Sequence, residues 1–193
     1  MEDFILYLKL GLYHVLDWQA YDHILFLIAL VVIYNFSNWK KVIWLVTLFT
    51  IAHTLTLALA AYKVINVNIS IVEFLIPLTI FITAAVNIFT VKKSKQKNSN
   101  VNLFFALFFG LIHGLGFSNY FRMLMDDSEA KLLPLLEFAI GIEIAQVIIV
   151  ITLLVLGYIA QTFFRISKRD WVLVLSSIVI GVVIPMLFDR IFW

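Results

Sequence analysis

The sequence contains no cysteine and little charge. The absence of cysteine excludes disulfides, thiolate metal sites, iron–sulfur clusters and cysteine nucleophiles. Charged residues make up 13% of the 193 residues, whereas a soluble domain contains about 25%, so the charge is too sparse to cover a water-facing surface. The 14 basic and 12 acidic residues give a net charge of +2, which is too small and too scattered to indicate binding to nucleic acid.

Hydrophobic residues, in contrast, account for 63% of the chain, and the mean hydropathy is +1.04. This composition predicts an all-α integral membrane protein that forms a single transmembrane helical domain over residues 1–193. Each of six apolar runs is close to or above the roughly 20 residues that cross a hydrocarbon core of about 30 Å. The runs cover residues 20–36, 42–62, 69–91, 101–121, 132–164 and 171–193.

A shorter apolar segment, from Phe4 to Leu16, precedes the first run. Its apolar residues share one helical face, so it is predicted to form an interfacial helix or an extension of the first span. A bundle of six transmembrane helices with this N-terminal helix is therefore expected, and seven helices are the alternative.

Basic residues are concentrated in alternate loops. Nine of them lie in the loops after the first, third and fifth runs, and five lie on the other side. Because Lys and Arg are retained on the cytoplasmic side, this pattern predicts a multi-pass protein of the cell membrane (inner or plasma membrane). Both termini are expected on the extracytoplasmic side, with the lipid bilayer as the surrounding partner.

Few ionisable side chains lie within the apolar runs, and each is a candidate functional residue because a charge in hydrocarbon costs at least ~2.5–3.5 kcal/mol. Counting a rise of about 1.5 Å per residue from the outer end of each run places them in the outer half of the bilayer. This gathering predicts one water-accessible cavity that opens to the outside. The candidate residues are His14 just before the first run, and Asp22, His23, His53, Glu73, His113 and Glu143 within the runs.

Histidines and carboxylates without thiols form the ligand set expected for a borderline divalent metal ion such as nickel, zinc or cobalt. For a transporter, such ligands must exchange and be reachable from both sides. In a metal-dependent intramembrane hydrolase or transferase, zinc would activate water, with Asp22, Glu73 or Glu143 as the base. The substrate would then be a lipid or a lipidated molecule. For any single histidine, the plainer alternative is an interhelical hydrogen bond, and Asp22 can also start its helix.

Two local patterns lie beside these residues. Pro77 has no backbone N–H to donate to the carbonyl of Glu73, four residues earlier, so this carbonyl is free for another donor. Gly110 and Gly114 flank His113 and predict that another helix backbone packs closely against it. The same small residues can pack between copies of the chain, so a homo-oligomer stays possible.

Uncharged polar residues also fall within the runs. Thr50 and Thr54 are expected to donate their hydroxyls to carbonyls of their own helix. Glu143 and Gln146 are three residues apart and are expected to share one helical face.

Five segments carry a resemblance to a known family. They are Gly11-Leu-Tyr-His14, Tyr21-Asp22-His23, Phe49-Thr50-Ile-Ala-His53-Thr54, Phe109-Gly110-Leu-Ile-His113-Gly114 and Gly141-Ile-Glu143-Ile-Ala-Gln146. In this order and spacing, over roughly residues 11 to 150, the chain resembles the HupE/UreJ family of small membrane proteins. Members are associated with hydrogenase and urease maturation and are regarded as nickel, or sometimes cobalt, permeases. The resemblance implies a multi-pass helical bundle whose His and Asp residues handle a divalent cation.

By position, Asp22 and His23 match the Asp-His motif of that family, and His14 matches its upstream histidine. Seven residues separate His14 from Asp22, where the better-known nickel permeases have five. His113 stands alone where they have a doubled His-Gly pattern that leads to Glu. We therefore expect a metal-binding membrane protein that admits nickel or a similar cation from the outer side. Its main ligands are predicted to be Asp22, His23, His53 and His113, with Glu73 or Glu143 balancing the charge.

Overall fold

The computed structural model describes residues 2–18, 21–91, 99–124 and 131–193. Within these ranges the chain folds into α-helices and one short 3-10 helix, and it has no strand. The elements are α1 (Glu2–Leu16), α2 (Asp22–Val31), η1 (Phe36–Asn38), α3 (Trp39–Ala61), α4 (Ile69–Thr90), α5 (Ser99–Gly116), α6 (Ser118–Leu124), α7 (Leu132–Thr162) and α8 (Lys168–Asp189). The predicted all-α class is confirmed.

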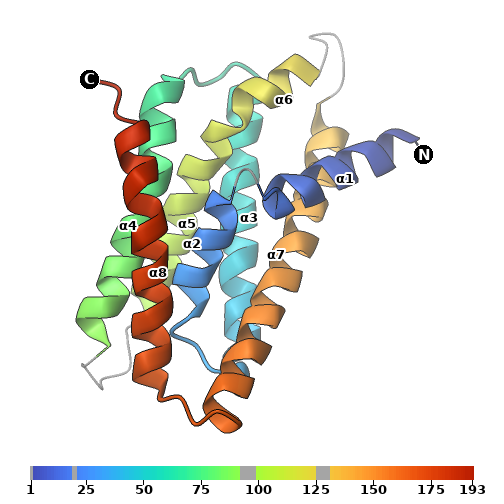
Figure 1. Cartoon of the computed structure of the whole chain (residues 1–193). Helices are drawn as coiled ribbons and strands as arrows, with labels where there is room; N and C mark the ends of the chain where they lie inside the picture. The colour runs from blue at the N-terminus through green and yellow to red at the C-terminus, as the bar shows by residue number, and fades with distance from the viewer. Residues whose placement is uncertain (1, 19–20, 92–98, 125–130) are drawn as a thin grey trace.

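The long helices α3, α4, α5, α7 and α8 run along the length of the molecule around the shorter helix α2 (Figure 1). Both chain ends lie toward the same end of this bundle, which we call the terminal end. Helix α1 crosses the bundle obliquely in the half nearer the terminal end, and its last turn approaches the start of α2. Eight of the ten residues of α2 are buried, so this helix forms part of the core.

Local signals in the sequence stop and start the long helices. Lys63 and Arg165, just after α3 and α7, have φ angles of 60° and 54°, a left-handed conformation that ends a helix. The side chain of Asn68 accepts the backbone N–H of Ser70 at the start of α4. Ser167 does the same for Asp170 at the start of α8. Each cap satisfies a backbone donor that a helix start leaves without an intrahelical partner.

Four helices of the described chain are long and apolar enough to cross a membrane. The count rises to five if α5 and α6, which are bent by 46°, form one broken span. The six predicted spans are therefore not confirmed. The difference lies in the run over 20–36, whose helix α2 has only ten residues and is about 15 Å long, half the thickness of the hydrocarbon core.

A residue far along the sequence explains where α2 ends. The ammonium group of Lys168, at the start of α8, donates to the carbonyls of Val32 at 3.0 Å and Tyr34 at 2.5 Å. These carbonyls follow the last turn of α2 and would otherwise need further helical N–H partners. Lys168 therefore lets the helix stop inside the bundle.

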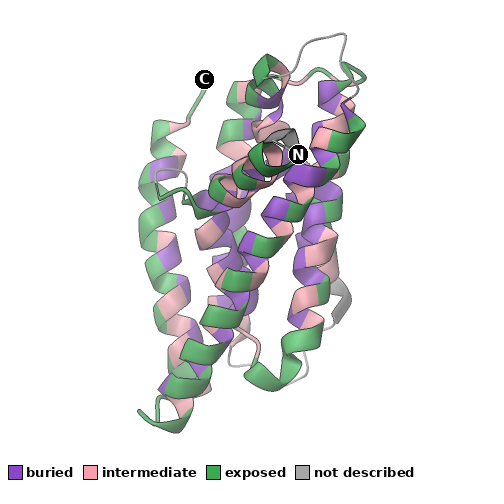
Figure 2. Cartoon of the chain, turned by 90° about the vertical axis from the view of Figure 1, so that its right-hand side faces the viewer, coloured by how far each residue is buried: buried purple, intermediate pink, exposed green. Residues whose placement is uncertain are grey.

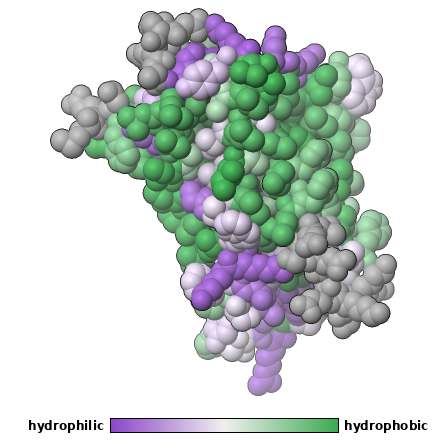
Figure 3. Space-filling model, turned by 180° about the vertical axis from the view of Figure 1, so that it is seen from behind, coloured by the Kyte–Doolittle hydropathy of each residue, from purple (hydrophilic) through white to green (hydrophobic). Residues whose placement is uncertain are grey.

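The outer faces of the long helices are hydrophobic. Exposed positions alternate with buried ones along them (Figure 2), and on α7 the exposed residues include Ile148, Ile151 and Leu156. Figure 3 shows a broad hydrophobic band over the middle of the molecule, with hydrophilic residues gathered toward both ends. Large exposed apolar surface is unfavourable in water, so the structure supports the predicted multi-pass membrane location.

Two glycine pairs bring helix backbones together. A Cβ atom on Gly114 would collide with the carbonyl of His53, and one on Gly110 would lie 2.6 Å from the carbonyl oxygen of Phe49. This confirms the close backbone approach predicted beside His113 and identifies the partner as α3. Likewise, Gly11 of α1 and Gly141 of α7 each face backbone atoms of the other helix.

Candidate metal site

Four helices bring the four histidines of the chain together. Ring centroids are 4.6 Å apart for His14 of α1 and His23 of α2, and 5.2 Å apart for His23 and His113 of α5. The ring of His53 on α3 lies 5.8 Å from that of His14 and 6.0 Å from that of His23. We call these four residues, with Asp22, the histidine cluster.

Three members are close enough to share one ion. Each of His14, His23 and His53 offers a ring nitrogen, and these three atoms lie within 4.8 Å of one another. His53 lies 8 residues before the end of α3 and 14 after its start, so the cluster is nearer the terminal end of the bundle. The sequence predicted such a shared site from depth alone.

Two of the histidines have a ring orientation set by a hydrogen bond. Nδ1 of His23 lies 2.9 Å from Oδ1 of Asp22, and Nδ1 of His113 lies 2.8 Å from the carbonyl oxygen of Phe109. When Nδ1 carries the proton and donates it to oxygen, the lone pair remains on Nε2. This is the arrangement in which metal-binding histidines are usually held.

Several nitrogen atoms of the cluster are buried without a hydrogen-bond partner. They are Nε2 of His14, His23 and His113, and both ring nitrogens of His53. Leaving a buried polar atom unsatisfied costs about 1–3 kcal/mol, so gathering five of them in one place needs an explanation. A divalent cation would use these lone pairs, and the residues therefore fit a metal ion.

Burial also keeps His14 in a form suited to metal binding. Helix α1 lies outside the candidate spans, and burial lowers the pKa of its His14 well below the ordinary value, because a charged imidazolium is poorly solvated there. Neutral imidazole is the form that binds metal.

Aromatic rings close the cluster on two sides. Away from the terminal end, the ring of Phe49 lies 5.3 Å from His113 and stacks 4.9 Å from Phe26. Toward the terminal end, Phe117 lies 4.1 Å from His14 and stacks on Phe138. The imidazoles thus lie between two apolar layers that limit the access of water.

The two glutamates predicted to join the site lie elsewhere. Glu73 is exposed on α4, and the carbonyl that Pro77 frees accepts a hydrogen bond from Arg190 at 3.3 Å. Glu143 of α7 is half-buried and bonds to Thr47 and Thr50 of α3. Of the predicted residues, the structure brings together His14, Asp22, His23, His53 and His113, and it holds Glu73 and Glu143 apart from them.

Sequence reasoning missed the phenylalanines that separate the cluster from the rest of the core. Phe49 and Phe109 each precede a cluster histidine by four residues, on helices that run toward the terminal end. Phe26 follows His23 by three residues on a helix that runs the other way. A phenylalanine about one helical turn from a cluster histidine, on each of three helices, is a signal that the sequence contains.

Two predictions about hydroxyl groups have different outcomes. Oγ1 of Thr50 lies 3.1 Å from the carbonyl oxygen of Val46 in its own helix, as predicted, although its one proton also has Glu143 as a nearer acceptor. Oγ1 of Thr54 is buried with no partner, so the prediction for Thr54 was wrong. Glu143 and Gln146 share one face as expected, since both contact Thr50.

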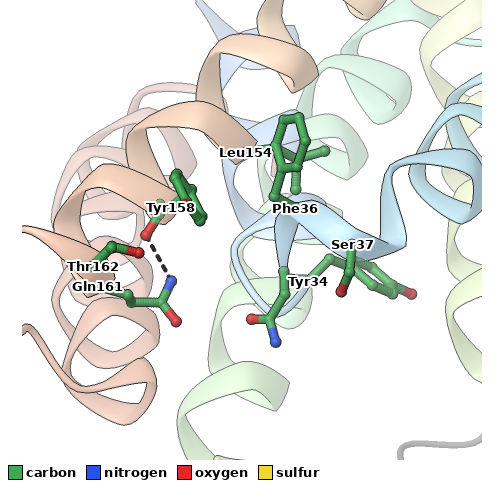
Figure 4. Close-up of a pocket in the computed structure, with 9 residues that line it drawn as sticks. Tyr34, Phe36, Ser37, Leu154, Tyr158, Gln161 and Thr162 are labelled. Carbon is green, nitrogen blue, oxygen red and sulfur yellow. Dashed lines mark hydrogen bonds between the residues drawn. The ribbon is translucent and has the colours of Figure 1, made fainter.

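A cavity of about 390 Å³ lies at the opposite end of the bundle from the chain ends. Figure 4 shows its polar and aromatic lining, with Gln161 donating to the carbonyl of Gly157 inside α7. The lining residues are Tyr34, Asn35, Phe36, Ser37, Leu154, Gly157, Tyr158, Gln161 and Thr162. None of these lining residues belongs to the histidine cluster, so the cavity is separate from that cluster.

Comparison with known protein families gives a match over nearly the whole chain. A family model described as HupE / UreJ protein matches residues 1–189, nearly the whole length. Searches of curated proteins and of solved structures give no match.

Proposed function

The chain belongs to the HupE/UreJ family, and from this premise we propose that it is a permease for nickel or a similar divalent cation such as cobalt. The observation that carries the proposal is the group of five unpartnered imidazole nitrogens in one buried cluster. Imidazole is a good ligand for nickel and cobalt as well as for zinc. The family favours the first two ions.

The histidine cluster would bind the ion through His14, His23 and His53, whose nitrogens are within reach of a common point. His113 adds a fourth nitrogen beside His23. Asp22 orients His23 and supplies negative charge, which offsets part of the charge of the cation.

We propose that the terminal end faces the outside of the cell. The opposite end of the bundle holds Lys40, Lys41, Arg165, Lys168 and Arg169, which supports a cytoplasmic location for that end. The cluster is nearer the terminal end, so the cation would reach it from the outside and leave toward the cytoplasm.

The test combines nickel binding with nickel uptake. Purified protein in detergent should bind about one tightly held nickel ion per chain by equilibrium dialysis and elemental analysis. Cells that express it should accumulate radioactive nickel. His53→Leu removes the imidazole and puts an apolar side chain in its buried position, so this variant should lose both properties. Thr152→Val, on the exposed face of α7, should keep both.

Equal uptake by the His53→Leu and wild-type proteins would contradict transport through the cluster. A bound ion that does not exchange with free nickel would also contradict it. The second result, with zinc as the ion found, would instead support an intramembrane hydrolase or transferase.

A further inference from the structure

A second polar cluster lies between α3 and α7 and is not part of the histidine cluster. Thr47 Oγ1 donates to Glu143 Oε1 at 2.6 Å, and Thr50 Oγ1 donates to Glu143 Oε2 at 2.5 Å. The same hydroxyl of Thr50 lies 3.2 Å from the amide oxygen of Gln146. We call Thr47, Thr50, Glu143 and Gln146 the oxygen cluster.

Gln146 has an unused polar group at this cluster. Its side chain is fully buried, with 0% exposure, and its Nε2 atom has no hydrogen-bond partner. The single proton of the Thr50 hydroxyl cannot serve both Glu143 and Gln146. Rotating the amide by 180° lets the nitrogen donate to Thr50 and leaves a carbonyl oxygen unpaired instead.

With the amide in that orientation, Glu143 accepts from two hydroxyls and the Gln146 oxygen stays free for a ligand. A buried amide oxygen beside a carboxylate is costly unless a cation or a donor fills the position. Both partners of the Glu143 carboxylate among the described residues are hydroxyls, so its charge is not neutralised by a lysine or arginine there.

The oxygen cluster follows the histidine cluster along the bundle. Thr50 precedes His53 by three residues, about 4.5 Å toward the opposite end. Helix α7 runs antiparallel to α3, because the ring of Phe138 lies 6.4 Å from that of His53 and Glu143, further along α7, meets Thr50. The oxygen cluster therefore lies on the side of the histidines that faces the opposite end of the bundle.

The two clusters differ in ligand chemistry. The histidine cluster offers neutral nitrogen ligands, which hold nickel more strongly than oxygen ligands do. The oxygen cluster offers a carboxylate, an amide carbonyl and two hydroxyls, with one negative charge to attract the ion. Passage of an ion through a protein requires sites that bind it and also release it, and adjacent weaker sites permit this.

We propose that the oxygen cluster is a second binding station for the transported divalent cation, on the cytoplasmic side of the histidine cluster. This inference rests on the proposed function, because it concerns the same ion. Glu143 and Gln146 are the ligands of this station, and Thr50 holds them in position. The station provides the exit ligands that a single tight site would lack.

Glu143→Gln tests the station while nearly preserving side-chain volume. Wild-type protein should bind a first nickel ion tightly and a second one weakly, whereas Glu143→Gln should bind only the first, with its affinity unchanged within about threefold. In proteoliposomes, nickel uptake by the variant should fall at least about tenfold. Thr50→Val should show the same pattern, and Thr152→Val, a matched change elsewhere on α7, should behave as wild type.

Four results are informative. Wild-type uptake by Glu143→Gln would overturn the second station, and so would loss of the first, tight nickel ion in that variant. A wild-type protein that binds and transports nickel but never takes a second ion would overturn it as well. A wild-type protein that neither binds nor transports nickel would overturn the proposed function. Nickel binding and transport by the wild-type protein are therefore measured before any variant.

Discussion

Adding one methyl group at Gly114 should separate α3 from α5 beside two cluster histidines. The required shift can be worked out at Gly110, one turn away, where an added Cβ would lie 2.6 Å from the Phe49 carbonyl oxygen, against 3.4 Å for the start of ordinary contact. The difference, 3.4 − 2.6, is 0.8 Å. At Gly114 the overlap with the His53 carbonyl is larger still, so the helices must move apart by more.

Overpacking of this kind costs about 1–3 kcal/mol, while replacing a helical glycine by alanine gains about 1 kcal/mol through helix propensity. The clean reference is Gly181→Ala on α8, because nothing lies within 4 Å of the added atom. Relative to Gly181→Ala, we expect Gly114→Ala to be less stable by about 1–3 kcal/mol, because the gain in helix propensity is common to both variants and only the overpacking cost differs.

Thermal unfolding in detergent, followed by circular dichroism, measures this difference. Nickel titration of the same samples should show at least about tenfold weaker binding for Gly114→Ala, because His53 and His113 move apart with their helices. If Gly114→Ala were as stable as Gly181→Ala and bound nickel like the wild type, the close packing of α3 on α5 would be refuted.

Three other changes test separate parts of the structure. Asp22→Asn removes the charge that faces His23 and should weaken nickel binding by about 10–100-fold in equilibrium dialysis; unchanged affinity would exclude that role. Lys168→Met leaves two carbonyls at the end of α2 without their donor and should lower the free energy of unfolding by about 1–3 kcal/mol. Arg169→Met, at an exposed neighbouring position, is its control, and equal melting temperatures would refute the capping of α2. Gly141→Ala should push α1 away from α7 and reduce nickel affinity through displacement of the only cluster histidine on α1, which a titration against wild type would reveal.

The helical class and most helix positions could be predicted from the sequence, because apolar runs and their polar breaks are local signals. The run over 20–36 shows where this reasoning ends. Its composition is that of a span, yet α2 stops after ten residues, and Lys168, 136 positions beyond Val32, supplies donors to the carbonyls that follow its last turn. A hydrogen-bond donor that far along the chain cannot be predicted from the local hydrophobic pattern.

The sequence predicted all the histidines of the candidate site, but of the three carboxylates predicted there only Asp22 lies in it. Counting the rise per residue gives the depth of a side chain in the bilayer, but it does not give the direction in which the side chain points around its helix. His53 and His113 point into the core, whereas Glu73, predicted in the same outer half of the bilayer, is exposed on α4. Only the packing of α4 against its neighbours decides that direction.

All four histidines of the chain lie in one cluster. Isotopic labelling of histidine alone would therefore place every labelled imidazole within the site, with no background from other parts of the protein. Nitrogen chemical shifts distinguish ring nitrogens that carry a proton, a lone pair or a metal ion. The protein thus contains a built-in spectroscopic reporter, and nickel addition can be followed at each imidazole in an otherwise unmodified chain.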